Sequence, residues 1–326
     1  MEERFNRFAL ALPTAESIDA VVSSAIPGQR ADYLWRGRSM VVELKVLTGD
    51  PQAKVERAFD ALSEREDAPL FVGPSPVDKV FRHLPDGAEK LRKLRQQVMR
   101  STEAAFRNAR RQIANTKKLF ELPDALGMLV VLNPDIETLS PIDVGQELSR
   151  LMEEQQSEGW AVDVAWLLSE AHLVDGAQPC ILITGSRIDR FEWASFYLDG
   201  LNAAWARFNN SPITTTDVER LIDVPMQKAS EARPGPLTRS EIWRKRYQAN
   251  PYFRSLDDTA LKQAGTEAFV SLMPYFLEGG PRRTMKELEP LMIRWSDFLE
   301  EARQRGLNMR GFGLPDGMPS SFNPGQ

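Results

Sequence analysis

The segment that most restricts the fold covers residues 30–46, RADYLWRGRSMVVELKV, which has the composition of two strands joined by a tight turn. Both halves are rich in β-branched and aromatic residues, and Gly37 and Arg38 lie between them. Glycine in the first position of a two-residue loop favours a type II′ turn. In that register, counting back along both strands places Asp32 directly opposite Glu43. The sequence therefore predicts a β-hairpin in which two carboxylates face each other.

The two faces of this hairpin differ in character because side chains alternate along a strand. Lys45 and Arg30 share the face of the carboxylates, and the other face carries Tyr33, Trp35, Met40, Val42 and Leu44. Like charges directly opposite each other destabilise a sheet, so a compensating charge is expected. A divalent cation held by the carboxylates would provide it, and so, in part, would Lys45. A solvated strand edge in another register, with an exposed polar face, is the alternative.

The order of Asp32, a turn, and Glu43-Leu44-Lys45 at the end of an apolar strand resembles the motif of the PD-(D/E)XK nuclease superfamily. Ala31 stands where that motif has proline. A preceding helix with a carboxylate, a following basic helix and a buried strand extend the resemblance. The resemblance implies an α/β protein with the restriction-endonuclease-like fold, a mixed β-sheet flanked by helices, and it leaves the subfamily undetermined.

The same resemblance implies roles for individual residues. Asp32 and Glu43 would bind Mg²⁺, for which Mn²⁺ would substitute, and the Leu44 carbonyl would add a ligand. Lys45 would orient or deprotonate the attacking water. Glu16 lies in the first turn of a helix predicted over residues 14–24 and would be an outer or second-metal ligand. Its charge could instead only complement the helix dipole.

A basic segment follows the hairpin within a helical pattern predicted over residues 87–120, as one rod or as two helices. Residues 90–118 contain ten Lys and Arg against the single Glu103, a net charge of +9, which leaves −14 for the rest of a chain whose total is −5. A stripe at helical spacing contains Lys93, Arg100, Arg107, Arg111 and Lys118. This asymmetry predicts contact with DNA phosphates, and a solvated helix face is the alternative. Gln112 lies beside the stripe and is expected to reach the site, as polar residues of this helix do in relatives.

The remaining pattern predicts a covered sheet and a helical C-terminal part. Expected strands cover residues 127–133, 160–168 and 179–184, and expected helices cover 51–65, 77–82, 142–156, 240–248, 257–276 and 284–306. We therefore expect a nuclease-like domain over 1–230 with a helical insertion at about 50–100, a helical region over 238–310, and an irregular tail over 311–326. The Pro- and Gly-rich segment 231–238 is the expected linker.

Composition excludes several classes of site. Cys180 is the only cysteine, and His83 and His172 are the only histidines, so the chain has no thiolate or imidazole cluster for zinc. A hydrolytic site is therefore expected to use carboxylates, lysine and a hard metal ion. Hydrophobic residues make up 42% of the chain and no run is long enough to span a membrane, so we expect a cytoplasmic protein without a membrane partner.

These observations predict an Mg²⁺-dependent deoxyribonuclease, an endonuclease acting in restriction, anti-phage defence or repair. DNA is the expected substrate because relatives mostly cut it. The alternative is a non-catalytic nucleic-acid-binding or scaffold subunit of a defence or repair complex with a nuclease-like fold. A homodimer, or a partner protein in such a complex, is compatible with both functions.

Overall fold

The computed structural model describes residues 1–22, 29–63, 69–71, 77–155, 159–174, 176–211, 226–231, 239–275, 285–310 and 312. The chain forms two compact units. Unit 1 comprises residues 1–56 and 95–233, and unit 2 comprises residues 57–94 and 234–326. Among the described residues, no helix combines the length and the apolar character needed to cross a membrane.

Unit 1 is built on a six-stranded mixed sheet in the order β1-β2-β3-β4-β5-β7. Its strands are β1 (Glu16–Ser17), β2 (Tyr33–Trp35), β3 (Met40–Val46), β4 (Leu126–Asn133), β5 (Val164–Ser169) and β7 (Cys180–Thr184). The neighbours β3, β4 and β5 are parallel, and the other pairs are antiparallel. A separate two-stranded sheet pairs β6 (His172–Val174) with β8 (Met226–Lys228).

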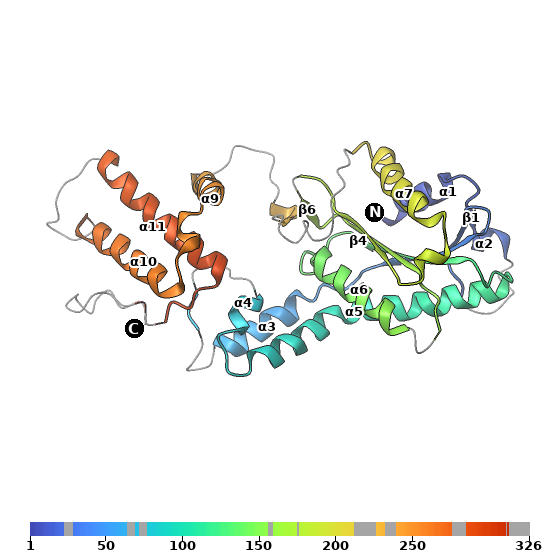
Figure 1. Cartoon of the computed structure of the whole chain (residues 1–326), viewed down its shortest axis with the longest axis horizontal. Helices are drawn as coiled ribbons and strands as arrows, with labels where there is room; N and C mark the ends of the chain where they lie inside the picture. The colour runs from blue at the N-terminus through green and yellow to red at the C-terminus, as the bar shows by residue number, and fades with distance from the viewer. Residues whose placement is uncertain are drawn as a thin grey trace. The chain divides into compact units, whose positions relative to one another are not determined.

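Helices cover both faces of the large sheet (Figure 1). On one face, α5 (Gly87–Leu119) and α6 (Pro141–Glu154) pack against residues such as Val41 and Leu129. On the other, α1 (Glu2–Ala11) and α7 (Ala194–Phe208) pack against residues such as Trp35 and Trp166. Every residue of β4 is buried, as expected for a parallel strand covered on both sides. The predicted α/β class, with a mixed sheet flanked by helices, is confirmed.

The predicted hairpin register is confirmed, whereas the predicted turn type is wrong. Trp35 pairs with Met40 and Tyr33 with Val42, so Asp32 lies directly beyond the last pair of the ladder, and its N–H donates to the Val42 carbonyl beside Glu43. The turn is type I′ rather than type II′, because both central residues have positive φ, 60° at Gly37 and 68° at Arg38. Contacts outside the hairpin hold this conformation. The Gly37 N–H donates to Thr14 Oγ1 at 2.8 Å, and the Arg38 guanidinium donates to both carboxylate oxygens of Glu16.

The N-terminal segment differs from the prediction. The helix expected over residues 14–24 is replaced by the short strand β1 and one helical turn, α2 (Ile18–Val21); residues 23–28 lie outside the described part of the chain. Pairing with the hairpin overrides the helical spacing, because β1 joins β2 and the Ile18 N–H donates to the Asp32 carbonyl at 2.9 Å. Helix α1 was not predicted, and its Phe5 and Phe8 pack on the rings of Trp166 and Trp205.

Unit 2 is helical, which confirms the predicted helical C-terminal region. It contains α4 (Val77–Phe81), α9 (Arg239–Ala249), α10 (Asp258–Leu272) and α11 (Met285–Arg305), with residues from α3 (Gln52–Ser63) and from the start of α5. Short 3₁₀ segments are η2 (Ile188–Arg190) and η3 (Ala229–Glu231) in unit 1, and η4 (Tyr252–Ser255) and η5 (Met273–Tyr275) in unit 2. The predicted linker falls almost entirely within residues 232–238, which are not described, and of the predicted tail only residue 312 is described.

Residues 57–94, predicted as part of an insertion in the nuclease-like domain, pack with the C-terminal region instead. Lys79 of α4, and Arg82 and His83 directly after it, contact the carbonyls of Gln304, Arg305 and Gly306 at the end of α11. Two of these side chains are cationic, and cations near a helix C-terminus are stabilising. The residues joined by these contacts are 223 to 225 positions apart in the sequence, so the fold brings together two segments that are distant along the chain.

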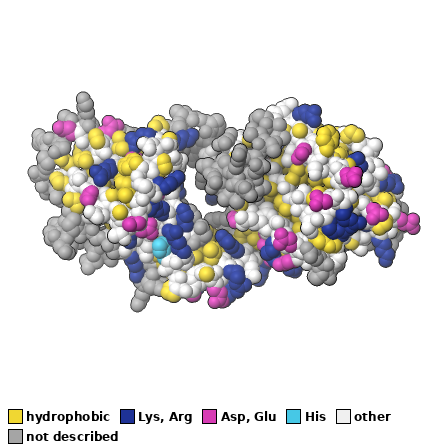
Figure 2. All heavy atoms as spheres, viewed as in Figure 1, with side chains coloured by type: hydrophobic (Ala, Val, Ile, Leu, Met, Phe, Trp, Pro, Cys, Tyr) yellow, Lys and Arg dark blue, Asp and Glu magenta, His cyan; other side chains and the backbone are white. Residues whose placement is uncertain are grey.

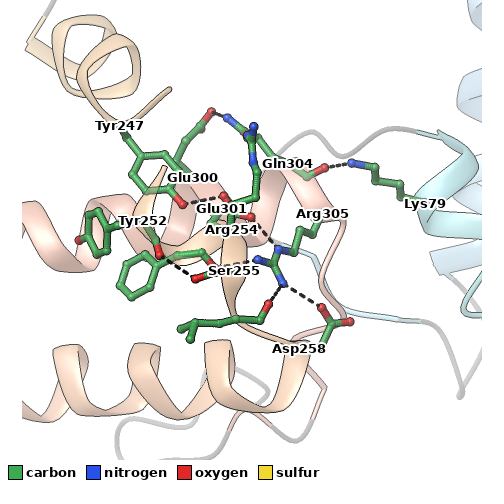
Figure 3. A network of polar contacts seen from close by, with 12 residues as sticks. Lys79, Tyr247, Tyr252, Arg254, Ser255, Asp258, Glu300, Glu301, Gln304 and Arg305 are labelled. Carbon is green, nitrogen blue, oxygen red and sulfur yellow. Dashed lines mark hydrogen bonds and ion pairs between the residues drawn. The ribbon is translucent and has the colours of Figure 1, made fainter. Parts of the chain in front are cut away.

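Arg305 is central to the polar network inside unit 2 (Figure 3). It donates to Glu301 Oε1 at 2.6 Å and to the carbonyl of Phe253 at 2.8 Å, and it lies 3.5 Å from Asp258. The other oxygen of Glu301, a residue that is only 1% exposed, accepts from the Tyr247 hydroxyl at 2.6 Å. Burying Glu301 is tolerable because both of its carboxylate oxygens are hydrogen-bonded.

We expect the paired substitution of Lys79 and Arg82 by alanine to loosen the end of α11. Removing two cations from the helix C-terminus should lower the free energy of local opening there by about 1 to 2 kcal/mol. Native-state hydrogen exchange of the last turn of α11 measures this change. Lys93→Ala, which breaks an exposed ion pair with Glu89, is the control. It should change the free energy of local opening at the end of α11 by less than about 0.5 kcal/mol. Equal protection in the two variants would contradict the capping role.

Candidate active site

Asp32 lies immediately before β2, and three hydrogen bonds hold it in position. Its N–H donates to the Val42 carbonyl at 3.1 Å, and its own carbonyl accepts from Ile18. Its carboxylate oxygen Oδ2 accepts the Leu44 N–H at 2.7 Å. The side chain therefore bridges back to β3, the strand that carries the other predicted site residues.

Glu43 is 1% exposed, on the face of the sheet that α5 covers. Its Oε1 forms an ion pair with Lys45 Nζ. Its Oε2 is buried and accepts no hydrogen bond from an N–H or hydroxyl group of the described residues. The Glu43 carboxyl group is instead within hydrogen-bonding reach of the Asp32 carboxyl group, so the two acids share this buried position, and Oε2 is a donor atom that a cation could take up.

Both carboxyl groups have raised pKa values. Burial, followed by the charge of Asp32, raises the pKa of Glu43 to about 8, and Lys45 opposes this shift without cancelling it. Burial also raises the pKa of Asp32, against the effect of the hydrogen bond from Leu44. The pair therefore retains protons at a pH where free carboxyl groups are ionised, and a bound cation would remove that tendency.

Lys45 is held between the hairpin and α5. Its Nζ donates to Gln112 Oε1 at 2.8 Å, and Gln112 Nε2 donates to the Arg30 carbonyl at 2.8 Å. Gln112 therefore reaches Lys45, and its predicted contact with nucleic acid stays a prediction. Gln112 thus links the lysine to the segment that leads into Asp32.

Two further side chains of α5 hold the same segment and were not predicted. Thr116 Oγ1, fully buried, accepts the Ala31 N–H at 2.8 Å, and Asn115 Nδ2 donates to the Gln29 carbonyl at 3.2 Å. Together with Gln112, they bind the main chain of three successive residues. In the sequence, Asn115 and Thr116 follow Gln112 at spacings of three and four residues, which places the three polar side chains on one face of the helix.

Glu16, the remaining predicted carboxylate ligand, lies away from the acid pair. Glu16 is not brought to the pair, because both of its oxygens bind Arg38. Its role as a metal ligand stays a prediction. Asp19, which sequence reasoning missed, is near enough for its charge to raise the pKa of Asp32.

The donor set fits a hard divalent cation only in part. Two carboxylates and the Leu44 carbonyl are the ligand types that Mg²⁺ accepts, and the unpaired Oε2 of Glu43 is one free donor atom. Among the described residues there is no group of three or more His, Cys, Asp or Glu side chains that could hold a metal ion. Any cation here would therefore depend on carbonyl and water ligands to complete its coordination.

The predicted basic stripe lies on the part of α5 that turns away from the sheet. Arg100, Arg107, Arg111 and Lys118 are all exposed. Glu103 pairs with Arg107 at 3.1 Å and with Arg150 at 3.9 Å, so its single negative charge offsets part of the stripe. Figure 2 shows acidic and basic side chains mixed on the face of unit 1 that it displays.

Comparison with protein-family models, with curated proteins and with solved structures found no match. The candidate site therefore rests on the geometry of the chain itself.

We expect the free energy of unfolding, measured in EDTA, to fall as pH rises from about 4.5 to about 8. A carboxyl group whose pKa is raised by folding binds more protons in the folded state, so its contribution to stability is lost across this window. Urea unfolding at several pH values should show a shallower dependence for Glu43→Gln. Glu192→Gln, at an exposed position of unit 1, is the control. The same pH dependence in all three proteins would show that Glu43 titrates normally.

Proposed function

We propose that this chain is a metal-dependent nuclease of the restriction-endonuclease-like fold that hydrolyses DNA, in the cytoplasm, as part of restriction, anti-phage defence or repair. The observation that carries the proposal is the proximity of the Asp32 and Glu43 carboxyl groups at the end of the β2–β3 pairing, with Lys45 against Glu43. Two carboxylates and a lysine on one strand pair are the groups that this hydrolysis requires.

Asp32 and Glu43 would hold Mg²⁺ or Mn²⁺ together with the Leu44 carbonyl. The ion would supply Lewis-acid activation of the phosphate and a lowered pKa for water. The protein positions these groups, since the Leu44 N–H orients Asp32, and Glu43 is buried beside Asp32 and Lys45. Lys45, which Glu43 and Gln112 hold in place, would orient the attacking water or accept its proton and would favour the charge of the phosphate.

The stripe on α5 would bind the DNA backbone. Arg111 precedes Gln112, so its side chain leaves the helix roughly 100° away from the residue that contacts Lys45. Phosphates bound by Arg107 and Arg111, with Arg100 and Lys118 on the same stripe, would position DNA without reading its sequence. Affinity from such contacts decreases as salt concentration rises.

One observation favours the alternative of a non-catalytic nucleic-acid-binding or scaffold subunit. The Glu43–Lys45 ion pair and the Leu44 hydrogen bond to Asp32 satisfy much of the site within the chain itself. A protein that used these residues only to stabilise the hairpin would have the same contacts. DNA binding without cleavage would support this alternative.

For the nuclease, we expect cleavage of plasmid DNA with Mg²⁺ or Mn²⁺ and none with EDTA. Glu43→Gln and Lys45→Ala should each reduce the rate by at least about 100-fold, because the first removes a charged ligand and the second removes the group that acts on water. Glu192→Gln, purified in parallel, should retain the rate, and circular dichroism should show that all the variants are folded.

In the same assay Glu16→Gln separates two roles. Because Glu16 binds Arg38, we expect the Glu16→Gln variant to retain most of the wild-type cleavage rate. A loss as large as that of Glu43→Gln would assign Glu16 to the metal site. Cleavage that survives both Glu43→Gln and Lys45→Ala would show that the hairpin is not the active site.

DNA binding gives an independent prediction. Arg107→Ala with Arg111→Ala should weaken binding at every sequence and reduce the slope of log affinity against log salt by about one for each lost phosphate contact. Arg92→Ala with Arg95→Ala, at exposed positions of the same helix that are outside the stripe, is the matched control. Fluorescence anisotropy over a salt series measures both. Equal slopes for the two double variants would contradict the role of the stripe.

A further inference from the structure

Strand β7 is the last strand of the large sheet in the part of the chain that the structure describes. Its five residues, CILIT, pair with β5 on one side. On the other side, no strand within the described ranges pairs with it. Unpaired edges expose a row of N–H and C=O groups that can pair with another strand.

The hydrogen bonds at the two ends of β7 show which residues form that row. The Ser169 N–H donates to the Pro179 carbonyl at 3.3 Å, and the Gly185 N–H donates to the Asp163 carbonyl at 2.9 Å. Backbone groups alternate along an antiparallel strand, so the odd-numbered residues from 179 to 185 face β5. Cys180, Leu182 and Thr184 therefore direct their N–H and C=O groups outward.

This row is complementary to itself. If two copies of β7 run antiparallel with Leu182 opposite Leu182, Cys180 of each copy lies opposite Thr184 of the other. Every outward N–H then meets an outward C=O. The strand has no charged residue, so this pairing brings no like charges together. It also lacks the lysine or proline that protects many natural edges.

The side chains of the strand also suit this pairing. Leu182 and Ile183 are only half-buried, and they lie in the clusters on opposite faces of the sheet. A second strand would cover both. We propose that β7 pairs with β7 of a second copy of this chain, so that two six-stranded sheets join across a two-fold axis at Leu182. The interface is isologous, as in most homodimers, and it does not depend on the proposed nuclease activity.

Engineered disulfides in the full chain test this register. In a Cys180→Ser background, Leu182→Cys should form a covalent dimer on mild oxidation, because opposite residues of a hydrogen-bonded pair have Cα atoms about 5.5 Å apart, within the disulfide range. Thr184→Cys should form one when Cys180 is present and should not form one in the Cys180→Ser background. Within one chain, positions 180 and 184 are roughly 13 Å apart along the strand and cannot be joined.

Light scattering provides the second measurement. The wild-type chain should have twice the monomer mass, and Leu182→Lys, which places two ammonium groups opposite each other, should have the monomer mass with an unchanged circular dichroism spectrum. Leu182→Val should remain dimeric. A monomeric wild type without the Leu182→Cys cross-link, or equal cross-linking of Thr184→Cys with and without Cys180, would overturn the proposal.

Discussion

The pairing of β2 with β3 is the interaction on which the candidate site depends. The register that pairs Trp35 with Met40 and Tyr33 with Val42 also brings Asp32 beside Glu43, and a shift of one residue would move one of the two carboxylates to the opposite face. The Leu44 N–H then fixes the Asp32 carboxylate at 2.7 Å, so that a backbone group of β3 orients a side chain that precedes β2. Position and orientation of the acid pair therefore come from the same hairpin.

Helix α5 supports this hairpin from the face where the charges lie. Its buried residues pack on the sheet, while Gln112, Asn115 and Thr116 bind the main chain at residues 29–31. These bonds satisfy backbone groups of residues 29–31, which are not part of a strand. The same helix carries Arg107 and Arg111 on its exposed side. A single helix thus connects the proposed phosphate contacts with the groups that hold Asp32 and Lys45.

The parts that could be predicted from sequence are those set by local pattern. Spacing within the hairpin was enough to derive the Asp32–Glu43 register, and the apolar run of β4 indicated a strand covered on both faces. The turn type was wrong because Thr14 and Glu16, distant in sequence, hold the backbone at Gly37 and Arg38. These tertiary contacts cannot be predicted from the conformational propensities of the turn residues alone.

Two further differences between the predicted and the observed structure also arise from contacts between residues distant in the sequence. The residues around Glu16 had helical spacing, yet pairing with β2 draws them into the sheet, and the carboxylate binds Arg38 instead of facing Asp32. Likewise, nothing near Lys79 indicates that it caps a helix that ends more than 200 positions later, since the two partners are 225 residues apart.

The central claim is that Asp32 and Glu43 form a site for a divalent cation. Isothermal titration of Mn²⁺ into the metal-free chain tests it most directly, without requiring a substrate. We expect saturable binding at one site, with release of protons from the acid pair, and loss of both signals in Glu43→Gln. Absence of binding to the wild-type chain, or equal binding to Glu43→Gln, would contradict it.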